Sequence, residues 1–134
     1  MDAILASQKA FFRTDVTLDV AFRKKQLKAF LKAMEDFDQE LADALWTDLH
    51  KSYEEAYLTE LSLVKGEIRE ALSHVSKWAR REKRMSPITI FGSRSYIVKE
   101  PLGCALIVSP WNYPVQLLLS PLVGAIAAGC TAVL

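Results

Sequence analysis

Residues 108 to 116 read Val-Ser-Pro-Trp-Asn-Tyr-Pro-Val-Gln and place one amide side chain, Asn112, within an apolar segment. No Asp, Glu, Lys, Arg or His occurs between Pro101 and Leu134. An asparagine in this setting has two chemical uses. Its side-chain oxygen can cap a helix by accepting a backbone N–H. Alternatively, its NH2 group can donate to an oxygen that becomes negative during a reaction. The spacing alone favours the cap, and the second use stays open.

The aromatic neighbours of Asn112 also have two interpretations. Trp111 and Tyr113 can be core residues that use their polar atoms for one hydrogen bond each. They can instead border a flat cofactor or a substrate pocket. The sequence of this stretch does not separate the two.

Other chemistry-bearing patterns are missing from the sequence. It has no GxGxxG, GxxxxGK[ST], GxSxG or HExxH motif. His50 and His74 are far apart, and Cys104 and Cys130 form no CxxC pair, so we expect no metal site and no redox pair. The two cysteines are expected to be small buried hydrophobes.

The elements that must position Asn112 begin with helices. A short helix is expected near residues 2–13, and a longer amphipathic helix after Thr17, continued or restarted towards Leu49. A third helix over residues 57–78 has an apolar face. Its opposite, polar face includes the following side chains: Glu60, Lys65, Glu67, Arg69 and Glu70. The basic run 77–84 is expected to be the solvated end of this helix.

Strand signals follow. Residues 88–91 and 95–98 are rich in β-branched and aromatic side chains and flank Gly92, which predicts a β-hairpin. Residues 104–108 predict a buried strand, 114–129 a helix and 131–134 a second buried strand. The sequence therefore predicts an α/β fold: a helical layer, a β-hairpin, and the first strand–helix–strand unit of a doubly wound parallel sheet. In such sheets, ligands bind at the carboxyl edge of the strands, where Asn112 lies.

Composition excludes several classes of function. The net charge is +1, which gives no overall field for nucleic acid or anionic membrane. The amino terminus lacks the basic and apolar regions of a signal peptide, so a cytoplasmic location is expected. Residues 115–134 carry no charge and could span a bilayer as one helix, but Pro121, Gly124 and Gly129 argue against it. A tail-anchored protein is therefore a minor alternative.

The apolar part of the chain resembles the aldehyde dehydrogenase superfamily. The resemblance rests on Glu100-Pro101-Leu102-Gly103, Pro110-Trp111-Asn112-Tyr113-Pro114, residues 121–129 and Val133-Leu134. Asp48-Leu49-His50-Lys51 and the Tyr of the W-N-Y-P motif are similar to the class 3, fatty-aldehyde-like branch.

The resemblance implies oxidation of an aldehyde to a carboxylic acid with NAD or NADP, through a cysteine thiohemiacetal. It implies that Asn112 donates to the substrate oxygen. The residues implied to line the nicotinamide are Val108, Ser109, Pro110 and Trp111, and those implied to border the aldehyde channel are Tyr113, Leu117 and Tyr57. A homodimer built partly on the hairpin is also implied.

The resemblance divides the chain into a helical segment (1–85), the hairpin of an oligomerisation element (86–100) and the start of a dinucleotide-binding domain (101–134). The family's catalytic Cys and Glu are expected beyond Leu134. We therefore expect this chain to be an amino-terminal fragment, inactive alone, that self-associates or is partly disordered beyond residue 100. A non-catalytic helical interaction module is the alternative function.

Overall fold

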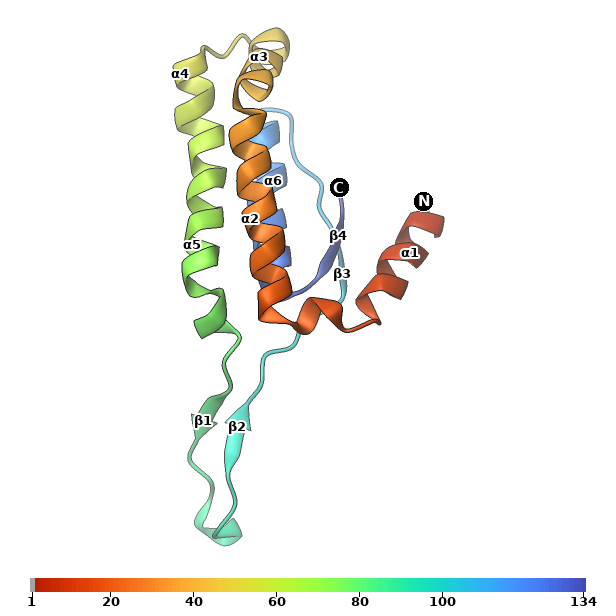
Figure 1. Ribbon diagram of the computed structural model, residues 1–134, viewed down its shortest axis with the longest axis vertical. Coiled ribbons are helices and arrows are strands. Elements are labelled where there is room, and N and C mark those ends of the chain that lie inside the picture. Colours follow the sequence, from red (N-terminus) through yellow and green to blue (C-terminus); the bar gives the residue numbers. More distant parts are fainter. Residues whose placement is uncertain (1) are drawn as a thin grey trace.

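The computed structural model describes residues 2–134. Long helices form the body, a thin hairpin extends from one end of it, and a pair of short strands lies between the body and the first helix (Figure 1). The helices are α1 (Asp2–Phe12), α2 (Val20–Asp36), α3 (Asp38–Leu49), α4 (Tyr53–Ala56), α5 (Ser62–Trp78) and α6 (Pro114–Ala128). The strands are β1 (Glu82–Arg84), β2 (Ser95–Ile97), β3 (Cys104–Leu106) and β4 (Thr131–Val133). The predicted order of helices, hairpin and strand–helix–strand is confirmed.

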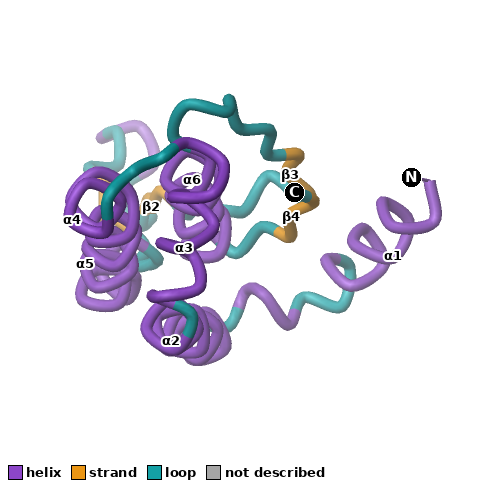
Figure 2. The backbone as a smooth tube through the Cα atoms, turned by 90° about the horizontal axis from the view of Figure 1, so that it is seen from above, coloured by secondary structure: helices purple, strands orange, loops and turns teal. Residues whose placement is uncertain are grey.

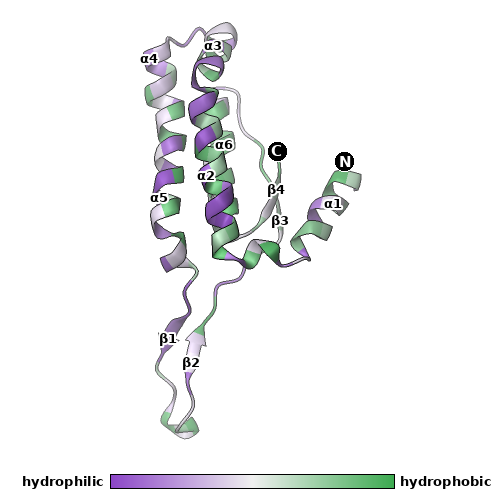
Figure 3. Cartoon of the chain, in the orientation of Figure 1, coloured by the Kyte–Doolittle hydropathy of each residue, from purple (hydrophilic) through white to green (hydrophobic). Residues whose placement is uncertain are grey.

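The core lies where α2, α5 and α6 pack together. Figure 2 shows α6 between the other long helices and the strands β3 and β4. In Figure 3, α6 is apolar along most of its length, whereas α2 and α5 are amphipathic. The buried apolar side chains at this junction include Leu27, Met34, Leu61, Val64, Ile68, Val75, Val123 and Ala127. Burial of these side chains is the main favourable term that holds α6 in place.

The helical layer begins largely as predicted. Thr17 lies in the 3-10 turn η1 (Val16–Leu18), and Asp19 caps α2 by accepting the Ala21 N–H at 2.9 Å. The chain breaks at Phe37 and restarts as α3. A restart, not one continuous helix, therefore carries the apolar pattern towards Leu49.

The predicted polar face of the third helix is partly wrong. Residues Tyr57–Leu61 form a π-helical segment, η2, between α4 and α5. The wider π turn breaks the 3.6-residue repeat, so positions before and after it do not share one stripe. Tyr57 is consequently exposed, and Ala56 is buried in its place. Glu60 and Lys65 are buried because they lie four residues from the buried Val64 and Leu61, so the buried face is wider than predicted, and Trp78 at the end of α5 is exposed.

The hairpin exists, but its first strand was misplaced. β1 pairs antiparallel with β2 through the register Lys83↔Tyr96, and Ile88–Ile90 form a 3-10 turn, η3, at the tip. Pro87 starts this turn because its ring fixes φ and removes a donor. The Lys99 ammonium lies 2.7 Å from a Glu82 carboxylate oxygen, and this hydrogen-bonded ion pair holds the pKa of Glu82 below its usual value. The basic run is thus a helix end only as far as Trp78; residues 79–81 form a connection, and Glu82–Arg84 lie in the hairpin strand β1.

The unit β3–α6–β4 has the predicted parallel arrangement, but β3 ends at Leu106 and is not buried as predicted, since Leu106 is 70% exposed. Cys104 pairs with Thr131 and Leu106 with Val133. α6 ends at Ala128, where Gly129 adopts φ +89° and turns the chain into β4. The alternative of one helix over residues 115–134 is therefore wrong. Across residues 2–134, no helix has both the length and the apolar character needed to cross a membrane.

Arg23 ties the carboxyl end of α6 to the start of α2. Its guanidinium donates to the carbonyl oxygens of Thr17 at 2.6 Å, Leu18 at 3.2 Å and Ala127 at 3.2 Å. Burial lowers the pKa of Arg23, and the carbonyl end of the helix provides a site that favours a cation.

Candidate active site

Asn112 lies in the loop that connects β3 to α6. Tyr113 is the N-cap of α6, so Asn112 precedes the cap by one residue. Its side chain is exposed and makes no hydrogen bond to another residue in the range 2–134. The amide is therefore available to a group outside this part of the chain.

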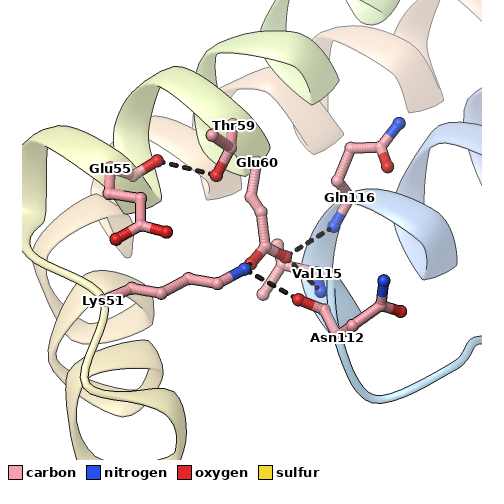
Figure 4. Close-up of polar contacts among 7 residues, drawn as sticks. All are labelled: Lys51, Glu55, Thr59, Glu60, Asn112, Val115 and Gln116. Carbon is pink, nitrogen blue, oxygen red and sulfur yellow. Dashed lines mark hydrogen bonds and ion pairs between the residues drawn. The ribbon is translucent and has the colours of Figure 1, made fainter.

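Glu60 occupies the amino terminus of α6 (Figure 4). Its Oε2 accepts the backbone N–H of Val115 at 2.8 Å and that of Gln116 at 3.1 Å. Pro114 has no N–H to satisfy, and the Leu117 N–H donates to the Tyr113 carbonyl oxygen at 3.0 Å. The first turn of α6 thus needs no further acceptor.

These contacts test whether the Asn112 side chain caps α6. The helix-cap interpretation, which the spacing favoured, is wrong because the Glu60 carboxylate caps α6 from another element. The same carboxylate takes the N–H groups that a helix start would otherwise offer to a bound anion.

Lys51 joins Glu60 to the loop. Its Nζ donates to Glu60 Oε1 at 2.6 Å and to the backbone carbonyl oxygen of Asn112 at 2.8 Å. It also lies 3.9 Å from the centroid of the Tyr113 ring, within cation–π range. The ammonium therefore contacts two consecutive residues of the W-N-Y-P motif.

The Lys51–Glu60 pair is almost completely buried. Glu60 is 0% exposed and Lys51 7% exposed. Buried charges are costly unless they are paired and hydrogen-bonded, and both oxygens of Glu60 and the ammonium of Lys51 have such partners. The negative Glu60 also matches the positive end of the α6 dipole.

The residues predicted to line the cofactor lie in the loop that leaves the carboxyl end of β3. Val108 is 80% exposed and Trp111 89% exposed, while Ser109 is half-buried and Pro110 exposed. Open α/β sheets bind nucleotides at this edge. Uncovered apolar surface beside a polar hydroxyl fits a flat nicotinamide ring, so these residues suit the implied cofactor.

The residues predicted to border the aldehyde channel come from two regions. Tyr113 and Leu117 lie at the start of α6, and the structure places Tyr113 over Lys51. Tyr57 lies in the π-helical segment, where it stacks on Tyr53 with ring centroids 6.0 Å apart. The π-helical segment also carries Glu60, so Tyr57 and the carboxylate that caps α6 come from the same element.

A second, partly exposed cluster links α3 to α4 and α5. Lys65 pairs with Asp38, which also accepts the Tyr53 hydroxyl at 2.8 Å. Burial acts to raise the pKa of Asp38, but the hydrogen bonds from Lys65 and Tyr53 outweigh it and lower that pKa. The bond to Asp38 raises the pKa of Tyr53. Asp38 thereby joins α3 to both α4 and α5.

Two expectations about metals and thiols can be compared with the structure. Within residues 2–134, no group of three or more His, Cys, Asp or Glu side chains could hold a metal ion. Cys104 and Cys130 are free thiols and are half-buried, not fully buried as expected.

Sequence reasoning missed Lys51 and Glu60 as parts of the site. One signal was available: Glu60, Val64 and Ile68 recur at intervals of four, which puts an acid on a buried helical stripe. A buried carboxylate needs partners, and a helix that starts with Pro114 and lacks its own side-chain cap can supply them.

The sequence matches the model of the aldehyde dehydrogenase family over residues 1–134. The chain belongs to the aldehyde dehydrogenase family. A curated relative, 4,4'-diaponeurosporen-aldehyde dehydrogenase of Staphylococcus aureus (strain NCTC 8325 / PS 47), is 44% identical over 126 residues, which cover 94% of this chain and 28% of that protein. Aldehyde dehydrogenase family 3 comG of Dictyostelium discoideum is 40% identical over all 134 residues and 28% of its own length. The class 3 resemblance is thereby confirmed.

Solved aldehyde dehydrogenases share the fold. The substrate-bound state of Staphylococcus aureus AldH has a TM-score of 0.91 and 45% identity, covering 93% of this chain and 27% of that one. Betaine aldehyde dehydrogenase from the same species, in complex with NAD+, has a TM-score of 0.84 and 25% identity, covering 96% of this chain and 25% of that one. The chain therefore spans about a quarter of the length of these aldehyde dehydrogenases.

Proposed function

We propose that the whole protein containing this chain is an NAD(P)-dependent aldehyde dehydrogenase that oxidises an aldehyde to a carboxylic acid. This part of it supplies the hydrogen-bond donor for the substrate oxygen. One observation carries the proposal: the Asn112 amide lies free at the carboxyl edge of the sheet because Glu60 already caps α6.

The chemistry explains why a free amide is useful there. When a cysteine thiolate adds to an aldehyde carbon, the carbonyl electrons move to the oxygen and a thiohemiacetal oxyanion forms. Asn112 donates one N–H of its amide to that oxygen, and the bond strengthens as the negative charge develops. A fixed donor of this kind contributes about 10² to 10³ in rate. By the family resemblance, the thiolate and the glutamate that activates water lie outside this chain.

The cofactor and the substrate take opposite sides of the motif in this proposal. Val108, Ser109, Pro110 and Trp111 hold the nicotinamide, which supplies a hydride acceptor when bound. Tyr113, Leu117 and Tyr57 border the aldehyde. Support comes from the exposure of Val108 and Trp111 and from the NAD+ complex of the related betaine aldehyde dehydrogenase.

We also propose that the 134-residue chain alone has no dehydrogenase activity. Leu106 is 70% exposed beside Val108, so apolar surface of the sheet lacks a cover within residues 2–134. Mixing this chain with aldehyde and NAD(P) should yield no NAD(P)H, and light scattering should show self-association. A monodisperse monomer that binds little of a dye for exposed apolar surface would contradict the expected self-association.

We further propose that the working form is a homodimer and that it is cytoplasmic. The hairpin supports the dimer. Its tip is apolar in Figure 3, and Ile88 and Phe91 are almost fully exposed. Exposed apolar patches of this kind mark interaction surfaces.

The test uses the full-length protein. It should form NAD(P)H in an aldehyde-dependent manner, and Asn112→Ala should lower kcat about 10²- to 10³-fold while the dissociation constant of the cofactor stays unchanged. An unchanged kcat in this variant would remove Asn112 from the reaction.

A further inference from the structure

We propose that Lys51 and Glu60 are positioning residues for Asn112, provided that Asn112 acts as described above. Together they hold the backbone of the loop and leave the amide of Asn112 free to face the reacting oxygen. Neither side chain needs to touch the substrate.

The first step is the anchor on the backbone. Lys51 donates to the Asn112 carbonyl oxygen and lies against the Tyr113 ring, so one ammonium fixes two successive residues. In Figure 4, the carbonyl oxygen of Asn112 points to Lys51, and its side-chain amide points away from the ion pair. The carbonyl and the side chain share one Cα atom, so fixing the carbonyl limits where the amide can go.

The second step is the removal of a competing role. An asparagine beside a helix start readily caps the free N–H groups, and this would turn its amide towards the helix. Glu60 Oε2 already accepts the N–H groups of Val115 and Gln116. The Asn112 side chain therefore has no acceptor task at α6.

The third step is the convergence of separate elements. Lys51 follows α3, Glu60 lies in the π-helical segment, and Asn112 precedes α6. The 2.6 Å contact between Lys51 and Glu60 links the three, and its near-complete burial reduces the screening that weakens exposed pairs. π-helical segments frequently occur at functional sites, and here the segment carries the capping carboxylate.

The experiment measures kcat in the full-length protein for the single variants Glu60→Gln, Lys51→Met and Asn112→Ala. It also measures kcat for two double variants, in which Glu60→Gln or Lys51→Met is combined with Asn112→Ala. The Glu60→Gln side chain would keep an acceptor for α6, but its NH2 group would face the Lys51 ammonium and push it from the Asn112 carbonyl. We expect Glu60→Gln and Lys51→Met each to lower kcat about 10- to 100-fold, since a small misplacement of a catalytic group has an effect of this order. In the Asn112→Ala background, the same changes should cost less than about threefold, because the group that they position is gone.

The matched control is Arg23→Met, which removes a buried cation from the opposite end of α6. It should lower the melting temperature, and its effect on kcat should be the same factor in the wild-type and Asn112→Ala backgrounds. If Glu60→Gln does not fold, the charge-balanced double variant Lys51→Met/Glu60→Gln replaces it.

The outcomes separate this inference from the proposed function. Equal factors for Glu60→Gln and Lys51→Met in both backgrounds would show a purely structural role and overturn the inference, while the dehydrogenase proposal stands. A full-length wild-type protein without aldehyde-dependent NAD(P)H formation would overturn the proposed function, and the inference with it. Loss of kcat only in the presence of Asn112 supports both.

Discussion

Gly129→Ala should destabilise the unit β3–α6–β4. Gly129 has φ +89°, a region that costs a residue with a Cβ about 1–2 kcal/mol. The added Cβ would also lie 2.6 Å from Arg23 Nη2 and 2.7 Å from the Thr17 carbonyl oxygen. Backbone cannot withdraw easily, so the guanidinium must move and lose at least one of its hydrogen bonds.

The size of the effect follows from these two contributions. A hydrogen bond that involves a charged group is worth about 1.5–3 kcal/mol. Together with the conformational cost, the free energy of opening should fall by about 2.5–5 kcal/mol. Gly66→Ala is the matched control, because Gly66 lies within α5 with no atom in the way of a Cβ. Alanine should stabilise that position by about 0.5–1 kcal/mol.

The assay is hydrogen exchange of the peptide that covers residues 125–134 in the full-length protein, read by mass spectrometry. At 1.4 kcal/mol per factor of ten, Gly129→Ala should speed exchange roughly 60- to 4,000-fold. Exchange unchanged from wild type, or equal acceleration in Gly66→Ala, would refute the reasoning about the turn.

Three further outcomes are expected. Lys65 and Tyr53 lower the pKa of Asp38 in the folded protein, so the Asp38 carboxylate stabilises the fold above its unfolded pKa of about 4, and this stabilisation is lost as the pH falls through the folded pKa. The difference in melting temperature between wild type and Asp38→Asn should therefore shrink in acid. A difference that stays constant with pH would contradict this. Replacing Cys104 and Cys130 by Ala in the full-length protein should leave kcat unchanged, and a loss of turnover would assign one of them to the reaction. Phe91→Ser should shift a sedimentation profile from dimer towards monomer, and an unaltered profile would remove the hairpin tip from the interface.

The parts of the fold that were predictable have strong local signals. α6 lies between Pro114 in its first turn and Gly129 just past its end, and both boundaries follow from backbone chemistry. The parallel strands on either side are short apolar runs without charge. The family motif around Asn112 then located the candidate site.

The parts that were missed depend on tertiary contacts. β1 consists of Glu82-Lys83-Arg84, which has low intrinsic preference for strands and forms because β2 lies beside it and Lys99 pairs with Glu82. Glu60 looked like a solvent-facing acid because acidic side chains are rarely fully buried unless they are paired, and its partners come from other elements. Its role as a cap depends on α6, which is far away in the sequence.

A crystal structure of the full-length protein with an aldehyde-derived adduct on its cysteine tests the account most directly. The account predicts that Asn112 Nδ2 lies within about 3 Å of the adduct oxygen while Glu60 still accepts the Val115 and Gln116 N–H groups. An Asn112 amide turned onto the first turn of α6, with Glu60 displaced, would contradict it.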